Sequence, residues 1–328
     1  MPTSKKDSGY NHIPVLLQQA ITLLDPKPGQ RFVDGTLGGG GYTSELLKKV
    51  GKSGAVLSID LDRAALDNAE AKFAKEVKSK NLVLAHGNFS QLDKILEHKD
   101  FYNIDGIVAD IGLSSFQLDE SGRGITFQKK EPLDMRFDVS SNEPDARFML
   151  NEYSEAELTK IFWEYGEEKE SKRIAHAIIN ARKIEGKKLH YTTDLTDLIQ
   201  EALPKPIKHK WADTARRIFQ ALRIAVNHEL DNLETFLPKA LDLVKPGGIL
   251  VIVSFHSLED RMVKQFFVQA SKGCICPKEF PICQCGKTPQ AEILTRKIVT
   301  ATEEELNLNS RSGSAKLRAI RKAGTLSI

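Results

Sequence analysis

The chain has 328 residues, of which 41% are hydrophobic and 28% charged, and its formal net charge is +3. This length suggests about two domains, and so small a net charge gives no whole-chain argument for nucleic-acid binding. The amino-terminal segment has no apolar core of signal-peptide length, and the longest apolar run, ILVIVSF, is far shorter than the ~20 residues of a membrane helix. We therefore expect a soluble, cytoplasmic protein.

The first third of the chain alternates apolar runs of strand length with segments whose apolar residues recur at helical spacing. This order predicts a parallel sheet with helices on both faces. The expected strands are residues 31–34, 55–60, 81–85 and 105–110, and the expected helices are residues 42–50, 61–77 and 90–97.

The alternation stops near residue 112, and most of the next 120 residues are expected to be helical. We therefore predict an α/β sheet domain made of residues 1–137 and 213–328, interrupted by an all-helical domain at residues 138–212.

The sheet pattern returns late in the chain. A strand is expected at residues 248–255 and a helix at residues 257–270. Two later runs, 292–300 and 315–321, alternate apolar and polar residues and predict a closing hairpin.

Four consecutive glycines, 38–41, follow the first expected strand. A glycine loop between a strand and a helix usually binds a nucleotide-type ligand. The phosphate loop of nucleoside triphosphatases is disfavoured, because Tyr42 stands where that loop has lysine. The dinucleotide fingerprint fits poorly, because Thr43 stands where it has glycine or alanine.

The S-adenosylmethionine loop, D-x-G-x-G-x-G, fits better. Asp34, Gly38 and Gly40 occupy its positions, with Thr36 in the first glycine slot. An acid here suits the ammonium group of methionine, whereas it would repel a pyrophosphate. Asp60 ends the second expected strand, where a carboxylate accepts hydrogen bonds from both ribose hydroxyls. A glycine-rich turn without a ligand is the structural alternative.

The fourth expected strand ends in Asp110, and long, uncommon motifs lie on either side of it. They are HIPVLL at 12–17, DGTLGGGGY at 34–42, SIDLD at 58–62, HGNFS at 86–90, DIGLSSFQLD at 110–119, RGITF at 123–127, PLDMRFD at 132–138, YGEE at 165–168, RRIFQALRIAVNHEL at 216–230, SFHSLEDR at 254–261 and RSGSAKLRAIRK at 311–322. Through these motifs nearly the whole chain resembles the bacterial 16S ribosomal RNA cytosine-N4 methyltransferases, the RsmH or MraW family.

The resemblance implies a Rossmann-like class I methyltransferase fold and S-adenosylmethionine as cofactor. It also implies methylation of the exocyclic N4 amine of a decoding-centre cytosine, conventionally position 1402 of 16S rRNA. The partner is then 16S rRNA or the 30S ribosomal subunit. Carried over residue by residue, the cofactor positions are Gly40, Gly41, Tyr42, Asp60, Phe89, Asp110 and Gln117.

The chain departs from the family pattern at two positions. Tyr42 stands where the family usually has histidine, and Phe116 stands where it usually has proline. Tyrosine packs and donates one hydrogen bond, but it cannot take the role of a titratable imidazole. We expect position 42 to contact the cofactor only.

Transfer to a cytosine amine needs alignment with the methyl group and an acceptor that localises the lone pair or takes a proton. Asp110 is the expected acceptor, with Ser114 and Ser115 as secondary contacts, and a purely cofactor-binding Asp110 is the alternative. Methylation at C5 would need a thiolate nucleophile, and no cysteine lies near the fourth strand.

RNA contacts are expected outside the cofactor loop. His256 and Arg261 follow the fifth strand and suit contacts with phosphate or with the substrate loop, although a structural histidine at such a turn is equally expected. The stretch KPIKHKWADTARR places Trp211 among basic residues, a combination that serves RNA phosphates and bases. A solvated helix face is the alternative there.

The four cysteines lie in one patch as C-x-C, six residues, C-x-C: Cys274, Cys276, Cys283 and Cys285. Four thiolates suit a tetrahedral zinc ion, but structural zinc sites usually use C-x₂₋₄-C. We expect no metal, with reduced cysteines in a loop.

Two other functions fit parts of the pattern. One is an amino-methyltransferase acting on another DNA or RNA target. Many amine methyltransferases carry the motif [DN]-P-P-[FY] at the end of the fourth strand, and the absence of this motif here disfavours that function. The other is a non-catalytic RNA-binding factor of ribosome assembly. For such a factor we would expect Asp60 or Asp110 to be lost, and both are present.

Overall fold

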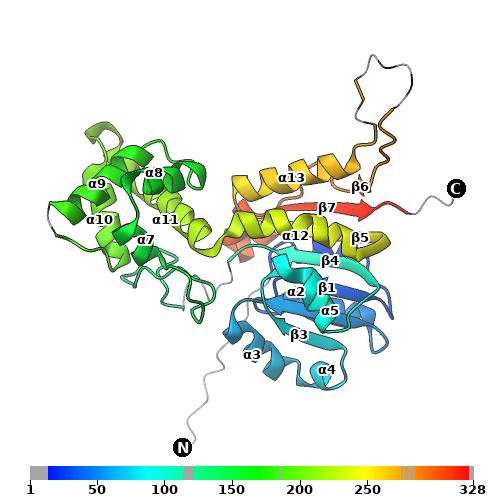
Figure 1. Cartoon of the computed structure of the whole chain (residues 1–328). Coiled ribbons are helices and arrows are strands. Elements are labelled where there is room, and N and C mark those ends of the chain that lie inside the picture. Colours follow the sequence, from blue (N-terminus) through cyan, green and yellow to red (C-terminus); the bar gives the residue numbers. More distant parts are fainter. Residues whose placement is uncertain are drawn as a thin grey trace, which may run out of the picture. The chain divides into compact units, whose positions relative to one another are not determined.

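The computed structural model describes residues 14–113, 118, 121–184, 186–274, 276–277, 280, 282 and 284–324. The chain forms two compact units (Figure 1). One unit contains the described residues up to Gly112 and from Asn232 onward, and the other runs from Leu113 to Asp231. No helix among the described residues is both long enough and apolar enough to span a membrane.

The first unit is built on a seven-stranded sheet with the order β3-β2-β1-β4-β5-β7-β6. Strands β1 to β5 are parallel, and β7 pairs antiparallel with both β5 and β6. The strands are β1 (Arg31–Asp34), β2 (Ala55–Asp60), β3 (Leu82–His86), β4 (Ile104–Asp110), β5 (Val244–Ser254), β6 (Ala291–Ile293) and β7 (Lys316–Lys322). This α/β arrangement confirms the predicted Rossmann-like class I fold.

The helices of this unit cover both faces of the sheet. They are α1 (Leu17–Leu24), α2 (Gly41–Val50), α3 (Arg63–Lys72), α4 (Ala74–Lys78), α5 (Leu92–His98), α12 (Glu229–Leu243), α13 (Ser257–Ser271) and α14 (Glu303–Leu308), with the 3₁₀ turns η1 (Phe89–Gln91) and η3 (Ser310–Ser314). The predicted helix at 61–77 is interrupted at Phe73, where α3 ends and α4 begins.

The two faces of the sheet carry separate apolar cores, because side chains alternate along each strand. In β4, Ile107 and Ala109 face a core shared with α5, α12 and α13. Val108, between them, faces a core shared with α1, α2 and α3. Both cores are fully apolar at their centres, which fixes the register of the strands and therefore the positions of the residues at their ends.

The second unit is helical. Its elements are α7 (Ala146–Glu152), α8 (Glu155–Glu164), α9 (Ser171–Lys183), α10 (Thr192–Ala202), η2 (Lys205–Lys210) and α11 (Trp211–Asn227). They enclose their own core, whose centre includes Phe162, Ile178 and Leu222, all without solvent exposure.

This helical unit is wider than the predicted insertion at 138–212. Helix α11 buries Ile218, Phe219 and Leu222 in the helical core. Leu133 and Met135, in the loop-rich segment before α7, pack into the same core. The division therefore falls after Gly112 and after Asp231, because burial of these apolar side chains assigns both segments to the helical unit.

The predicted closing hairpin is confirmed as an antiparallel pair of β6 and β7, but β6 is only three residues long. Val299 adds a single bridge to Leu317, and α14 occupies part of the connection between the strands.

Candidate functional site

Three of the parallel strands end in aspartate, and their ends lie at one edge of the sheet. Asp34 ends β1, Asp60 ends β2 and Asp110 ends β4. Because β2 lies on one side of β1 and β4 on the other, chain connections leave the sheet in opposite directions at this point. Open α/β sheets bind ligands at such a switch point, beyond the carboxyl ends of the strands.

Asp34 is fully buried at the base of this edge. Its carboxyl group accepts hydrogen bonds from the Thr43 hydroxyl at 2.7 Å and from the Thr36 N–H at 3.2 Å. The hydroxyl of Ser58 lies 2.7 Å from that of Thr43. Burial raises the pKa of Asp34 to about 7, and the negative charge of Asp60 adds to the rise. A cation bound here would restore the ionised form.

Asp60 is held by two backbone groups. Its two carboxylate oxygens accept hydrogen bonds from the N–H of Gly38 and the N–H of Asp62, each at 2.8 Å. Burial nevertheless raises the pKa of Asp60 to about 6. The side chain is therefore oriented before any ligand arrives, with lone pairs left over for hydroxyl donors.

The glycines between β1 and α2 are required for different reasons. Gly38 and Gly40 have positive φ angles of 48° and 72°, which favour glycine. A Cβ on Gly38 would lie 4.0 Å from the Thr36 carbonyl oxygen, an ordinary contact, whereas one on Gly40 would lie 2.8 Å from the Phe73 ring. A Cβ on Gly41 would collide with Pro14. Close packing inside the protein therefore explains Gly40 and Gly41, whereas the surroundings of Gly38 are not closely packed.

Asp110 lies next to Asp34 across the switch point. Its backbone N–H donates to the Thr36 hydroxyl at 2.7 Å, and its carboxylate accepts from the Gly112 N–H at 3.3 Å. Burial raises the pKa of Asp110 to about 7, and the charges of Asp34 and Glu259 raise it further. A carboxyl group with this pKa exchanges protons near neutral pH, as an acceptor in proton transfer must.

The Tyr42 side chain is occupied within the fold. It is 3% exposed, and its hydroxyl donates a hydrogen bond to the Val15 carbonyl. Burial raises the pKa of its hydroxyl well above the usual value, so Tyr42 stays neutral. Its ring packs among the side chains that separate α1 and α2 from the sheet. Because the side chain of Tyr42 is occupied in this way, a ligand could contact residue 42 only through its backbone, at the start of α2.

Phe89 lies just after β3, on the same edge of the sheet. It is partly buried, and its ring meets that of Phe236 edge-on with centroids 4.9 Å apart. The contact of Phe89 with an adenine ring stays a prediction. Gln117, Ser114 and Ser115 lie outside the described residues.

His256 is the residue before α13, at the end of β5. Its Nδ1 accepts a hydrogen bond from the Glu259 N–H at 3.4 Å, while the Glu259 carboxylate accepts from the His256 N–H at 3.2 Å. This capping box explains His256 as a structural residue of the turn. Arg261 is exposed one turn further along α13.

In the helical unit, Trp211 begins α11 and is partly buried. Its ring lies 6.2 Å from that of Phe127, at the border of the helical core. Lys205, Lys208 and Lys210, just before it, are exposed, and none of them forms an ion pair with any residue that the structure describes. The lysines present the accessible charge, and Trp211 contributes mostly to packing.

Sequence reasoning missed the polar support beneath the site. Thr43 mismatches the dinucleotide fingerprint, yet its hydroxyl joins Asp34 to Ser58. Thr36 stands in a glycine position of the S-adenosylmethionine loop, and it bonds both to Asp34 and to Asp110. The sequence signal for this support is the presence of hydroxyl residues close to an acid that ends a buried strand.

Comparison with known proteins agrees with this geometry. A model of the MraW methylase family matches residues 9–323. Ribosomal RNA small subunit methyltransferase H of Heliobacterium mobile is 46% identical over 314 residues, which cover 95% of this chain and 99% of that protein. The protein of the same name from Caldicellulosiruptor saccharolyticus is 43% identical over 313 residues, again 95% and 99% of the two chains.

Solved structures are more distant in sequence. An rRNA methylase from Streptococcus thermophilus aligns with a TM-score of 0.40 and 11% identity, covering 95% of this chain and 99% of that one. The assignment therefore rests on the family match and on the sequence relatives, both of which extend over nearly the whole length: the chain belongs to the MraW methylase family.

Proposed function

We propose that the protein methylates the exocyclic N4 amine of a cytosine in the decoding centre of 16S rRNA, at conventional position 1402. The observation that carries the proposal is the family match over residues 9–323, combined with an acidic switch point that suits a cationic methyl donor. The substrate is 16S rRNA, free or within the 30S subunit, and the protein acts in the cytoplasm.

The methyl donor is S-adenosylmethionine, which supplies an electrophilic methyl group on a positively charged sulfonium. The residues at the switch point fit it. Asp60 would accept hydrogen bonds from the ribose hydroxyls, and Phe89 would border the adenine. Asp34 and Asp110 would face the positively charged end, and the absence of a close contact at Gly38 is compatible with a ligand lying against its backbone.

Asp110 is our proposed acceptor for the cytosine amine. The amine is a weak nucleophile because its lone pair is delocalised into the ring. A carboxylate that accepts a hydrogen bond from this amine would localise the lone pair, and it would take up the amine proton as the methyl group leaves the sulfur and bonds to the nitrogen. A pKa of about 7 lets Asp110 do this near neutral pH and then release the proton to solvent.

The position of the cysteines supports N4 over C5 as the target atom. Methylation at C5 uses a thiolate that adds to the ring. The described cysteines come after α13, a helix that begins at the carboxyl end of β5 and runs back along the sheet. After the cysteines, the backbone of Gln290 bonds to that of Ala270, at the end of α13, and the chain enters β6. Strand β6 pairs with the last residues of β7, and these residues lie beside the start of β5. The three described thiols thus lie at the edge of the sheet opposite Asp110.

The helical unit is our proposed RNA-binding part. Residues 160–223 contain 14 Lys and Arg against nine Asp and Glu. Part of this positive charge is neutralised internally, since Arg217 pairs with the buried Glu168 at 2.6 Å and Arg223 pairs with Glu229 at 2.8 Å. The exposed lysines of η2 are left to attract phosphates.

The test is to identify the nucleoside that receives label when the protein, labelled S-adenosylmethionine and 30S subunits are combined. Label in N4-methylcytidine supports the proposal. Label in 5-methylcytidine, or in no cytidine, contradicts it.

A further inference from the structure

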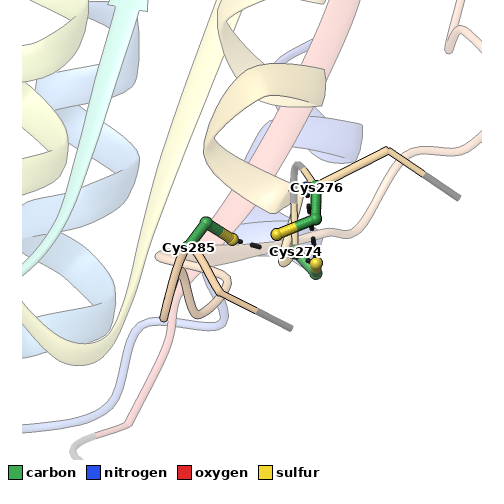
Figure 2. Close-up of side chains that lie close together, drawn as sticks. All are labelled: Cys274, Cys276 and Cys285. Atoms are coloured by element: carbon green, nitrogen blue, oxygen red, sulfur yellow. Dashed lines mark hydrogen bonds between the residues drawn. The ribbon is translucent and has the colours of Figure 1, made fainter. Parts of the chain in front are cut away.

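Three cysteine side chains converge between α13 and β6, far from the acidic switch point. The sulfur atoms of Cys274, Cys276 and Cys285 all lie within 4.8 Å of one another. Figure 2 shows Cys274 and Cys276 on one arm of the segment and Cys285 on the other. The sequence places them 11 residues apart at most, so the chain must fold back to bring these sulfurs together.

The separation of the sulfurs matches a metal site and excludes a disulfide in this arrangement. The sulfur atoms of Cys274 and Cys285 are 3.8 Å apart. A disulfide would need about 2.05 Å. With Zn–S bonds of about 2.3 Å, two sulfurs of a tetrahedral site lie about 3.8 Å apart. The pair is therefore spaced as one edge of a zinc–thiolate tetrahedron.

Backbone N–H groups point at the sulfurs. The N–H of Cys276 donates to Cys274 Sγ at 3.4 Å, and the N–H of Gln284 donates to Cys276 Sγ at 3.3 Å. Such bonds orient the sulfur atoms as ligands. The first of them also answers the objection to C-x-C spacing, because the backbone N–H of Cys276 lies against the sulfur of Cys274.

The large apolar side chains described in this segment are exposed. Phe280 is 45% exposed and Ile282 is 76% exposed, so these two residues do not form a core. At its base, the N–H of Gln290 donates to the Ala270 carbonyl at 2.9 Å, and the Lys287 ammonium donates to the Gln269 carbonyl at 3.4 Å. A short segment without a core is typically stabilised by a metal or another cross-link.

From these observations we propose that Cys274, Cys276 and Cys285 bind a zinc ion as thiolates, and that this ion cross-links the segment between α13 and β6. Its role is structural, because the site lies at the edge of the sheet opposite Asp110. Zinc fits because thiolate sulfur is its preferred ligand and the site needs no redox chemistry. Cys283 lies outside the described residues and stays unchanged in every variant below.

The test measures zinc in the full-length protein after reduction, reloading with zinc sulfate and removal of excess metal. The wild type should retain about one equivalent, whereas Cys274→Ser and Cys285→Ser should each retain less than about a tenth. Gln284→Ala is the matched control, because it keeps the backbone N–H that bonds to Cys276 and should retain the full equivalent. Cobalt(II) in place of zinc should give a thiolate charge-transfer band that both serine variants lose.

Two further readouts separate a metal site from a merely structural role of the cysteines. A strong chelator should lower the thermal unfolding midpoint of the wild type and leave that of Cys285→Ser unchanged. Methyl transfer by Cys285→Ser should stay within about threefold of the wild-type rate when the variant is assayed below its own midpoint. Less than about a tenth of an equivalent of zinc in the reloaded wild type, or full zinc in Cys285→Ser, would overturn the proposal.

Discussion

The backbone N–H of Gly38 donates a hydrogen bond of 2.8 Å to Asp60, 22 residues further along the chain. This bond joins the glycine loop after β1 to the end of β2. It fixes the position of Gly38, and it orients the carboxylate that we assign to the ribose. Loop and acid are therefore one unit, preorganised before the cofactor binds.

Replacing Asp60 with alanine should weaken S-adenosylmethionine binding about 10- to 100-fold, as expected for the loss of hydrogen bonds to a charged group. Isothermal titration calorimetry measures the change. Asp67→Ala is the matched control, because Asp67 is exposed on α3. An Asp60→Ala protein that binds the cofactor within about twofold of the wild type would remove Asp60 from the site.

Asp110→Asn should separate the two roles considered for this residue. The asparagine can still accept from the Gly112 N–H, but it cannot take a proton. We expect methyl transfer at saturating cofactor to fall at least about 100-fold, while the cofactor Kd changes less than about tenfold. Single-turnover transfer and calorimetry provide the two values. A near-normal rate with a greatly raised Kd would make Asp110 a cofactor ligand only.

The raised pKa of Asp34 predicts a pH-dependent stability. Its value is about 7 in the folded protein, against 3.8 for an ordinary aspartate. Between these pH values the folded state binds more protons than the unfolded state, so the free energy of unfolding falls as the pH rises. Asp34→Asn should remove this contribution and stabilise the cofactor-free protein by roughly 1–3 kcal/mol at about pH 8, with little effect near pH 4.

Urea unfolding of the wild type and Asp34→Asn at several pH values measures this effect. Methyl transfer by the variant should be reduced, because the amide no longer offers a negative charge to the cofactor. If the two proteins show parallel stability profiles between about pH 4 and pH 8, burial of Asp34 does not disfavour its ionised form.

Tyr42→Phe should reduce stability without abolishing catalysis. The change deletes the donor to the Val15 carbonyl and leaves that oxygen unsatisfied in a buried position, at a cost of about 1–3 kcal/mol. Chemical denaturation checks the loss of stability, and transfer at saturating cofactor should stay within about threefold of the wild type. A folded Tyr42→Phe protein without activity would show that the hydroxyl takes part in the reaction.

The sequence predicted the sheet well, because both signals involved are local. Alternating apolar runs and helical periodicity identified the parallel strands, and the aspartates at three strand ends indicated the edge of the sheet where a ligand is expected. The bounds of the helical unit could not be predicted from such local signals. The apolar face of α11 could pack against the sheet unit or against the helical unit, and only the structure shows that it packs against the core around Phe162.

The details of the site depend on contacts that have no local signal. Tyr42 bonds to Val15, 27 residues earlier, and the collision between Gly41 and Pro14 joins two loops. The cysteines show the same limit, since C-x-C spacing argues against a shared site, whereas the structure brings the three described sulfurs within 4.8 Å of one another.

In our proposal, the atom that receives the methyl group is N4 of the cytosine. The most direct measurement combines the protein, tritium-labelled S-adenosylmethionine and 30S subunits from cells that lack this activity, followed by digestion and nucleoside chromatography. We predict label in N4-methylcytidine, and at least about 100-fold less of it with Asp110→Asn. Label in 5-methylcytidine, or cofactor binding without transfer to either 30S subunits or free 16S rRNA, would contradict it.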